Sequence, residues 1–372
     1  MRLLFAIKRL ENTAGGAERV LAHITGTLAR RGHDVRVLTW DASGASPFFR
    51  LDPAVKLVNR GVGDSSRPTR PGELAARIGD LRGAVRGQAP DVAIGFGHPM
   101  FVPLALALAG TGIPVVASEH AARAHYANRR ADYALFRIAA RLARCVTVTT
   151  EAVGADYSAD IRRRIVVMPN PIMIDAPVPA RRAGQLLLNV GRLDPQKDQA
   201  TLIRAFARIA PRFPGWRLRI LGEGHLRGAL EALVAETGLA DRVTLPGTTR
   251  DILAAYAEAD AFVLSSAFES FGLVTLEAMA QRLPVVGFAD CPGTNELVVC
   301  GETGLLVHAG AVRAAALAEG MARLMDDAAL RLQMGEAGYA RAAALVAADD
   351  AVDRWEALLR RIAGREARPC AA

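Results

Sequence analysis

SSAFESFGLVTLEAMA, residues 265–280, is the stretch of this chain that most clearly indicates its fold. It follows the apolar run of residues 261–264 and becomes a helix pattern near Gly272. A buried strand that turns directly into a helix is typical of parallel α/β proteins. The first amides of the helix point into the turn. There they and the helix dipole favour an anion, and Gly272 allows an oxygen to approach the backbone closely.

Two glutamates lie in this stretch. Glu269 precedes the helix, whereas Glu277 lies within it, roughly 8 Å from its start. Carboxylates accept hydrogen bonds from neighbouring hydroxyls, so one of the two can meet a sugar and the other a ribose. The alternative is a helix whose acidic residues only favour its positive N-terminus. Glu277 lies too deep in the helix for that role.

The same alternation of strand and helix extends in both directions. Continuous apolar runs predict strands at residues 3–7, 34–40, 91–96, 114–118, 145–149, 186–190, 217–221, 242–245, 261–265, 284–288 and 304–307. Helix patterns lie between most of these runs, and from Val312 onward the chain is almost wholly helical in pattern. This pattern predicts an α/β protein with two Rossmann-like domains, each built on a parallel sheet.

The length of 372 residues also favours two domains. Prolines crowd between residues 168 and 179, where they forbid both helix and central strand, so the linker is expected there. We therefore expect a first domain over residues 1–170 and a second over 171–345. The C-terminal helix, within 346–372, is expected to cross back onto the first domain.

Composition excludes several classes of protein. The four cysteines (Cys145, Cys291, Cys300 and Cys370) form no CxxC motif, so neither a zinc site nor a disulfide framework is predicted. The net charge of +8 indicates an anionic partner, but aromatic residues make up only 5%, which disfavours nucleic acid. No apolar run reaches about 18 residues, and the N-terminus lacks a signal-peptide pattern, so we expect a cytoplasmic protein.

A second candidate segment, NVGRLDPQKD, covers residues 189–198 and leaves the first strand of the second half. It brings Arg192 and Lys197 to the crevice where open parallel sheets bind ligands. Two cations there can clamp a diphosphate and stabilise charge on a departing nucleoside diphosphate. The alternative is a solvated basic loop.

Together these motifs resemble glycosyltransferase family 4. The resemblance covers nearly the whole chain and rests on five features: Gly15 to Arg19, Pro-Asn-Pro around Asn170, Gly191-Arg192 with Lys197, Gly222-Glu223-Gly224, and Glu269 and Glu277 separated by seven residues. It implies the GT-B fold, in which two Rossmann-like domains face an interdomain cleft. It also implies a nucleotide sugar bound by the second domain, an acceptor bound by the first, and transfer with retention of the donor's anomeric configuration.

The resemblance also assigns roles. It implies that Arg192 and Lys197 contact the diphosphate, that Glu277 contacts the ribose, and that Glu269 contacts the transferred sugar. The remaining donor-binding residues that it implies are Gly16, Gly191, Gly222, Pro246, Gly247, Phe271, Gly272 and Leu273. It places His120 beside the donor sugar, with His98 as the competing histidine.

The implied catalytic set is His120, Glu269, Arg192 and Lys197. In the route usually considered for such enzymes, the leaving phosphate oxygen helps to deprotonate the acceptor hydroxyl. The two cations take the place of a metal, so neither a metal nor a cofactor is expected. Asn295 and Glu296 fall where the family often has a further acidic residue. His33 is expected only to end a helix.

The expected partners are a nucleotide-sugar donor, with UDP-hexose or UDP-N-acetylhexosamine favoured, and a glycan or lipid-linked acceptor. The helix expected over residues 128–144 carries Arg130, Arg137, Arg141 and Arg144, a basic face suited to an anionic membrane surface or simply to solvent. Two other functions stay open. One is a UDP-sugar epimerase of the same fold, and the other is a non-catalytic nucleotide-binding scaffold.

Overall fold

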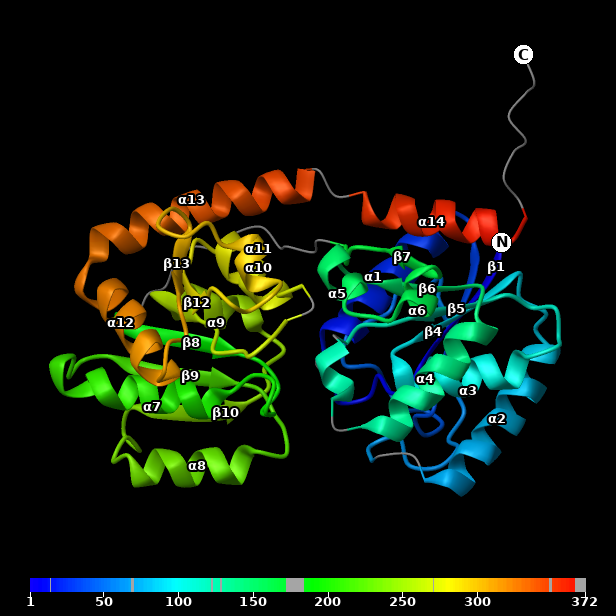
Figure 1. The fold of residues 1–372 in the computed structure, drawn as a ribbon, viewed down its shortest axis with the longest axis horizontal. Helices are drawn as coiled ribbons and strands as arrows, with labels where there is room; N and C mark the ends of the chain where they lie inside the picture. The colour runs from blue at the N-terminus through cyan, green and yellow to red at the C-terminus, as the bar shows by residue number, and fades with distance from the viewer. Residues whose placement is uncertain are drawn as a thin grey trace, which may run out of the picture. The chain divides into compact units, whose positions relative to one another are not determined.

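The computed structural model describes residues 1–13, 15–67, 70–121, 123–127, 129–171, 184–269, 271–347 and 350–364. The chain divides into two units, of which the first comprises Met1–Pro171 with Asp350–Ala372 and the second comprises Ile172–Asp349. Cys370, most of the predicted linker and the end of the predicted C-terminal segment lie outside the described residues. Each unit is an α/β structure on a parallel sheet, as the sequence predicts (Figure 1).

The first unit contains a seven-stranded sheet in the order β3-β2-β1-β4-β5-β6-β7. Its strands are β1 (Arg2–Ile7), β2 (Asp34–Thr39), β3 (Lys56–Asn59), β4 (Val92–Phe96), β5 (Val115–Ser118), β6 (Cys145–Val148) and β7 (Ile165–Val167). Its helices are α1 (Gly16–Arg30), α2 (Pro71–Arg86), α3 (His98–Leu108), η1 (Arg123–Tyr126), α4 (Arg130–Leu142), α5 (Glu151–Ala155), α6 (Ala159–Arg162) and α14 (Ala351–Ile362).

Helix α14 packs within this first unit although it ends the described chain. Its Trp355 is 2% exposed and stacks on Phe96 with ring centroids 6.0 Å apart. Its Glu356 accepts from Arg31 at 2.7 Å and lies 3.1 Å from the Nε2 of His33. His33 therefore does more than end α1, because it joins that helix end to α14.

The second unit contains a six-stranded sheet in the order β10-β9-β8-β11-β12-β13. Its strands are β8 (Leu186–Val190), β9 (Arg217–Leu221), β10 (Val243–Gly247), β11 (Ala261–Val263), β12 (Val285–Phe288) and β13 (Gly304–Val307). Its helices are α7 (Gln199–Ile209), η2 (Ala210–Arg212), α8 (Arg227–Glu236), α9 (Ile252–Glu258), α10 (Leu273–Ala280), α11 (Thr294–Leu297), α12 (Arg313–Asp326) and α13 (Ala328–Ala347).

Strand residues of this sheet alternate between two apolar cores. Leu187 faces the core built with α7, α8 and α12, whereas Leu188 faces the core built with α9, α10 and α13. The strand order reverses direction between β8 and β11, since the chain continues to β9 on one side and reaches β11 on the other. In open parallel sheets such a reversal leaves a crevice at the carboxyl ends of the strands, where ligands bind.

The sequence pattern does not predict two of the strands, β3 and β7. Every residue of β7 is only half-buried, and β3 begins on the exposed Lys56. Both lie at the edges of their sheet, where the continuous apolar run that identifies a central strand is not required. Within the described part of the chain, no helix combines the length and the apolar character needed to span a membrane.

Candidate functional site

The loop after β8 is held by hydrogen bonds within itself and to the loop after β9. The amide of Lys197 donates to the carbonyl of Asp194 at 3.1 Å, and the amide of Leu193 donates to the carbonyl of Glu223 at 2.9 Å. Asp198 then caps α7, its carboxylate accepting from the amide of Thr201 at 3.3 Å. These contacts hold Lys197 at the carboxyl end of β8, beside the reversal point of the sheet.

Lys197 forms an ion pair with Glu269 across that reversal point. The Nζ of Lys197 donates to Oε1 of Glu269 at 2.6 Å, and the two side chains are 14% and 8% exposed. Three hydrogen bonds join the same two loops, from the amide of Ala267 to the carbonyl of Gln196 (2.9 Å), from the side chain of Gln196 to the carbonyl of Phe268 (3.0 Å), and from the hydroxyl of Ser265 to the carbonyl of Lys197 (2.8 Å). A largely buried charge pair is thus fixed on a rigid framework.

Arg192 differs from Lys197 in its surroundings. Its side chain is 63% exposed and pairs with Asp194 at 3.0 Å. The sequence predicts that both cations share one role, but the structure places one in a buried pair and the other at the surface of the same loop. The side chain of Arg192 can change its conformation to contact an anion, because an exposed ion pair is weak and costs little to break.

Gly191 after β8, Gly222 after β9 and Gly247 at the end of β10 allow three segments of backbone to touch. A Cβ on Gly222, whose φ is +146°, would lie 1.9 Å from the carbonyl oxygen of Gly191. The amide of Gly222 donates to the carbonyl of Gly247 at 2.9 Å. Gly191 and Gly247 are thereby tied to Gly222, while the adjacent Pro246 is exposed. These glycines therefore bring the backbones at the carboxyl ends of β8, β9 and β10 into close contact.

The start of α10 follows the loop after β11. Gly272 caps the helix in the left-handed region, with φ of +82°, and the following Leu273 is half-buried. The amide of Glu269 donates to the carbonyl of Pro292 at 3.2 Å, and a Cβ on Gly293 would lie 3.1 Å from the backbone of Phe271. The loop after β12 therefore supports the turn in which helix amides lack intrahelical acceptors.

Glu277 has a partner that the sequence did not reveal. The hydroxyl of Tyr256, a residue only 1% exposed, donates to Oε2 of Glu277 at 2.9 Å. Tyr256 lies on α9, in an apolar helix pattern that indicates core packing and gives no sign of a polar role. The hydrogen bond orients the Glu277 carboxylate on α10.

In the first unit, His120 follows β5 at the carboxyl edge of the sheet. Its Nε2 lies 3.0 Å from the hydroxyl of Ser118, which accepts from the hydroxyl of Thr147 at 3.0 Å. The ring stacks on Phe96 with centroids 4.7 Å apart. Burial lowers the pKa of His120 to about 4, so its imidazole is neutral at neutral pH.

Glu119, beside it, is a buried acid that sequence reasoning did not select. It is 2% exposed, and it accepts from the amide of Ala121 at 2.8 Å and from the hydroxyl of Tyr126. Burial raises the pKa of Glu119 to about 7. The loop that carries His120 is therefore anchored by a carboxyl group that titrates near neutrality.

Replacing Glu119 with glutamine should flatten the pH dependence of stability. A folded-state pKa raised from 4.5 to about 7 means that the folded state binds more protons than the unfolded state between these values. The contribution of Glu119 to stability is therefore greatest below pH 4.5 and falls as the pH rises to 7, by roughly 3 kcal/mol. We expect denaturant titrations from pH 5 to 8 to show this loss in the wild type and to show a smaller slope in E119Q. Parallel slopes would contradict the assignment, whatever the absolute stabilities.

The other predicted residues occupy separate places. Gly16 begins α1, and His98 begins α3 with its pKa lowered by burial and its buried Nε2 without a hydrogen-bond partner. Asn295 and Glu296 are exposed, and the side-chain amide of Asn295 donates to the carbonyl of Ala289 at 3.0 Å. The described residues include no cluster of three or more histidine, cysteine or acidic side chains suited to a metal.

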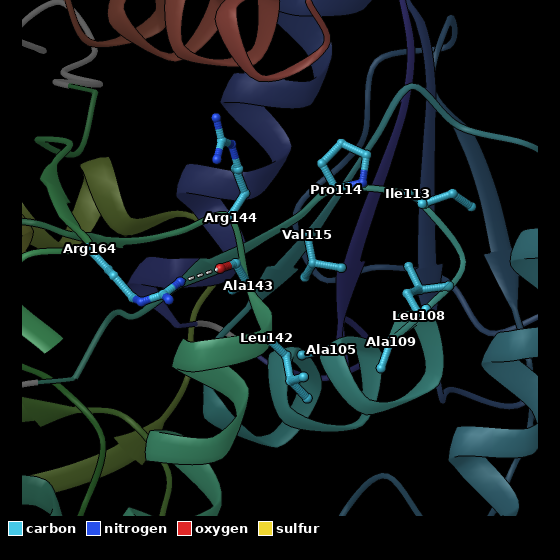
Figure 2. A pocket seen from close by; sticks show the side chains of 12 residues that line it. Ala105, Leu108, Ala109, Ile113, Pro114, Val115, Leu142, Ala143, Arg144 and Arg164 are labelled. Atoms are coloured by element: carbon cyan, nitrogen blue, oxygen red, sulfur yellow. Dashed lines mark hydrogen bonds between the residues drawn. The ribbon is translucent and has the colours of Figure 1, made fainter. Parts of the chain in front are cut away.

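A cavity of about 340 Å³ lies elsewhere in the first unit (Figure 2). It is lined by Val115 at the start of β5, by Leu142 at the end of α4, and by Arg144 and Arg164, which immediately precede β6 and β7. Because all strands of this sheet are parallel, the cavity lies at the edge opposite His120. It is therefore separate from the residues that the sequence selected.

Two family models match the chain in succession. The model described as Glycosyltransferase Family 4 matches residues 14–176, and the model described as Glycosyl transferases group 1 matches residues 175–341. With two parallel-sheet Rossmann-like units, these matches define a glycosyltransferase of GT-B fold. The chain belongs to the family 4 glycosyltransferases, as the sequence motifs indicated.

Relatives extend over most of the chain. The D-inositol 3-phosphate glycosyltransferase of Pseudarthrobacter chlorophenolicus is 30% identical over 88% of this chain and 86% of that protein. A Streptomyces coelicolor protein named exopolysaccharide phosphotransferase is also 30% identical, over 95% of this chain, and the chain spans 40% of its length.

Solved structures share the fold. Sucrose-phosphate synthase of Thermosynechococcus elongatus superposes with a TM-score of 0.81 at 24% identity, covering 97% of this chain and 99% of that one. The Anabaena protein HepE in complex with UDP-glucose superposes with a TM-score of 0.72 at 22% identity, covering 98% of each chain.

Proposed function

We propose that this protein transfers a sugar from a nucleoside diphosphate sugar to an acceptor with retention of configuration and without a metal. The observation that carries the proposal is the Lys197–Glu269 pair at the reversal point of the second sheet. Glu277 and the first amides of α10 follow the loop that carries Glu269, and Gly222 packs on Gly191 in the loop that leads to Lys197. A cation, two carboxylates and the first amides of a helix are what a diphosphate, a ribose and a sugar require together.

In the proposed reaction, Lys197 and Arg192 stabilise the charge that develops on the departing diphosphate. Glu269 accepts hydrogen bonds from hydroxyls of the transferred sugar, and Glu277 accepts them from the ribose. The leaving phosphate oxygen takes the proton of the acceptor hydroxyl as the acceptor attacks from the same face. The neutral imidazole of His120 can exchange hydrogen bonds with a sugar hydroxyl without adding charge.

UDP is the proposed nucleotide, and UDP-hexose or UDP-N-acetylhexosamine the proposed donor. The support is the HepE structure with UDP-glucose and the shared fold. A donor that binds the folded state raises its melting temperature by mass action. Melting curves with UDP-, GDP- and ADP-sugars should therefore show a shift with at least one UDP-sugar. No shift with any of them would contradict the donor site.

The same samples separate this function from the alternatives. A transferase consumes the bound nucleotide sugar faster when a glycan or lipid-linked acceptor is added, and the new bond keeps the anomeric configuration of the donor. A UDP-sugar epimerase turns over the nucleotide sugar alone, and a scaffold turns over nothing. Chromatography of the products, followed by NMR of the new anomeric proton, distinguishes the three.

We also propose a lipid-linked or membrane-bound glycan acceptor and peripheral attachment to the cytoplasmic membrane face through α4. Arg137 and Arg141 both pair with Asp160, at 3.4 and 2.8 Å, while Ile138 and Leu142 are 46% and 45% exposed. In the proposed attachment, these exposed apolar side chains enter the membrane interface beside the basic side chains of α4. Vesicles containing anionic lipid should sediment the wild type at low salt. Equal sedimentation of I138E/L142E, or none of the wild type, would contradict this attachment.

A further inference from the structure

Arg313 is the first residue of α12, outside every segment in which the sequence predicts site residues. Its guanidinium carbon lies 3.8 Å from the ring centroid of Phe288, the last residue of β12. Nη1 donates to Oδ2 of Asp290 at 3.2 Å, and Nη2 donates to the carbonyl of Ser266 at 3.5 Å. Nε lies 3.9 Å from Oδ2 of Asp198. One side chain thus reaches the loops after β8, β11 and β12.

Three of these contacts lie in loops that carry or support donor-site residues. Asp198 directly follows Lys197, and Ser266 precedes Glu269 by three residues in the loop after β11. Asp290 lies in the loop whose Pro292 carbonyl accepts from the amide of Glu269. The loops after β8 and β11 thus carry Lys197 and Glu269 themselves, and the loop after β12 supports the backbone of Glu269.

We propose that Arg313 is a positioning residue of the donor site. It holds the three loops in fixed positions relative to one another, so that Lys197 and Glu269 contact the donor at the same time. This inference rests on the proposed function. Arginine suits the role because its planar guanidinium can stack on a ring while its separate N–H groups address several acceptors. Lysine would keep the positive charge but lose the planar group with several N–H donors, and alanine would lose both.

Arg282 provides a matched control in the same unit. Its guanidinium carbon lies 4.0 Å from the ring centroid of Tyr339, and its Nε lies 2.9 Å from Oε1 of Glu336. It therefore has a ring contact and an ion pair like those of Arg313, but both of its partners lie on α13, away from the three loops. A loss that comes only from removing a stacked arginine should appear equally in both alanine variants.

The test is calorimetric titration of UDP, GDP and ADP into the wild type, R313A, R313K and R282A. For the nucleotide that the wild type binds, R313A should raise Kd about tenfold, R313K should raise it less, and R282A should leave it unchanged. Equal Kd values for R313A and R282A would overturn the role of Arg313. Failure of the wild type to bind any of the three would instead contradict the proposed donor site.

A double-mutant cycle separates positioning from simple loss of stability. If Arg313 acts through Lys197, R313A should raise Kd much less in a K197A background than in the wild type. Multiplication of the two single effects would show that the residues act independently and would overturn the inference. Melting temperatures of all variants, measured without ligand, confirm that the folded protein is being titrated.

Discussion

Replacing Lys197 with alanine should lower kcat/KM for glycosyl transfer by roughly 100- to 1000-fold. A loss of this size is typical when an enzyme loses one preorganised group that stabilises the charge developing in the transition state. Lys197 qualifies because its side chain is 14% exposed and is held at 2.6 Å from Glu269. Steady-state rates with saturating acceptor and varied donor would measure the loss.

Because the substitution also leaves Glu269 without its partner, K197A should cost about 3 kcal/mol of stability. The double variant K197M/E269Q removes both charges and should recover most of that stability, while transfer stays as low as in K197A. Recovery of transfer together with stability would show that the pair is structural, and it would contradict the catalytic role of Lys197.

The second large effect is expected from G222A, which should destabilise the second unit by about 3 kcal/mol. The added Cβ would lie 1.9 Å from the carbonyl oxygen of Gly191, and φ of +146° disfavours any side chain. The clash is with backbone, so it is relieved only if the loops after β8 and β9 separate. Donor binding should be lost with it.

G228A is the matched control for this substitution. Gly228 lies in the first turn of α8, and no heavy atom lies within 4 Å of the position of an added Cβ. Alanine there should maintain or slightly raise stability, because alanine favours helix more than glycine does. Scanning calorimetry of both variants, with and without a UDP-sugar, measures the two effects. A G222A protein that melts and binds like the wild type would refute the close approach.

Much of the fold could be predicted from local pattern alone. Central strands such as β8 and β11 are continuous apolar runs because both of their faces are buried, and that signal needs no knowledge of the partner strands. The edge strands β3 and β7 lack it, since they are only partly covered. Alternation of strand and helix then implies parallel sheets, because parallel neighbours need a crossover connection.

The sequence predicts part of the candidate site. The spacing of Glu269 and Glu277 around a helix start points to these two residues, and the place of Lys197 after a strand points to the third. The sequence does not point to Glu119 or Tyr256. The importance of each depends on its burial and on a hydrogen-bond partner that no sequence periodicity reveals.

The sequence by itself determined the two Rossmann-like units and the loops that carry the candidate donor site, because strand burial, helix periodicity and glycine turns act between near neighbours in the chain. Only the tertiary structure decided that Lys197 pairs with Glu269, 72 residues away, and that Arg313 reaches both loops. Such contacts depend on strand order, which brings the loops after β8 and β11 side by side. Strand order is set by the packing of the whole sheet, and no local pattern encodes it.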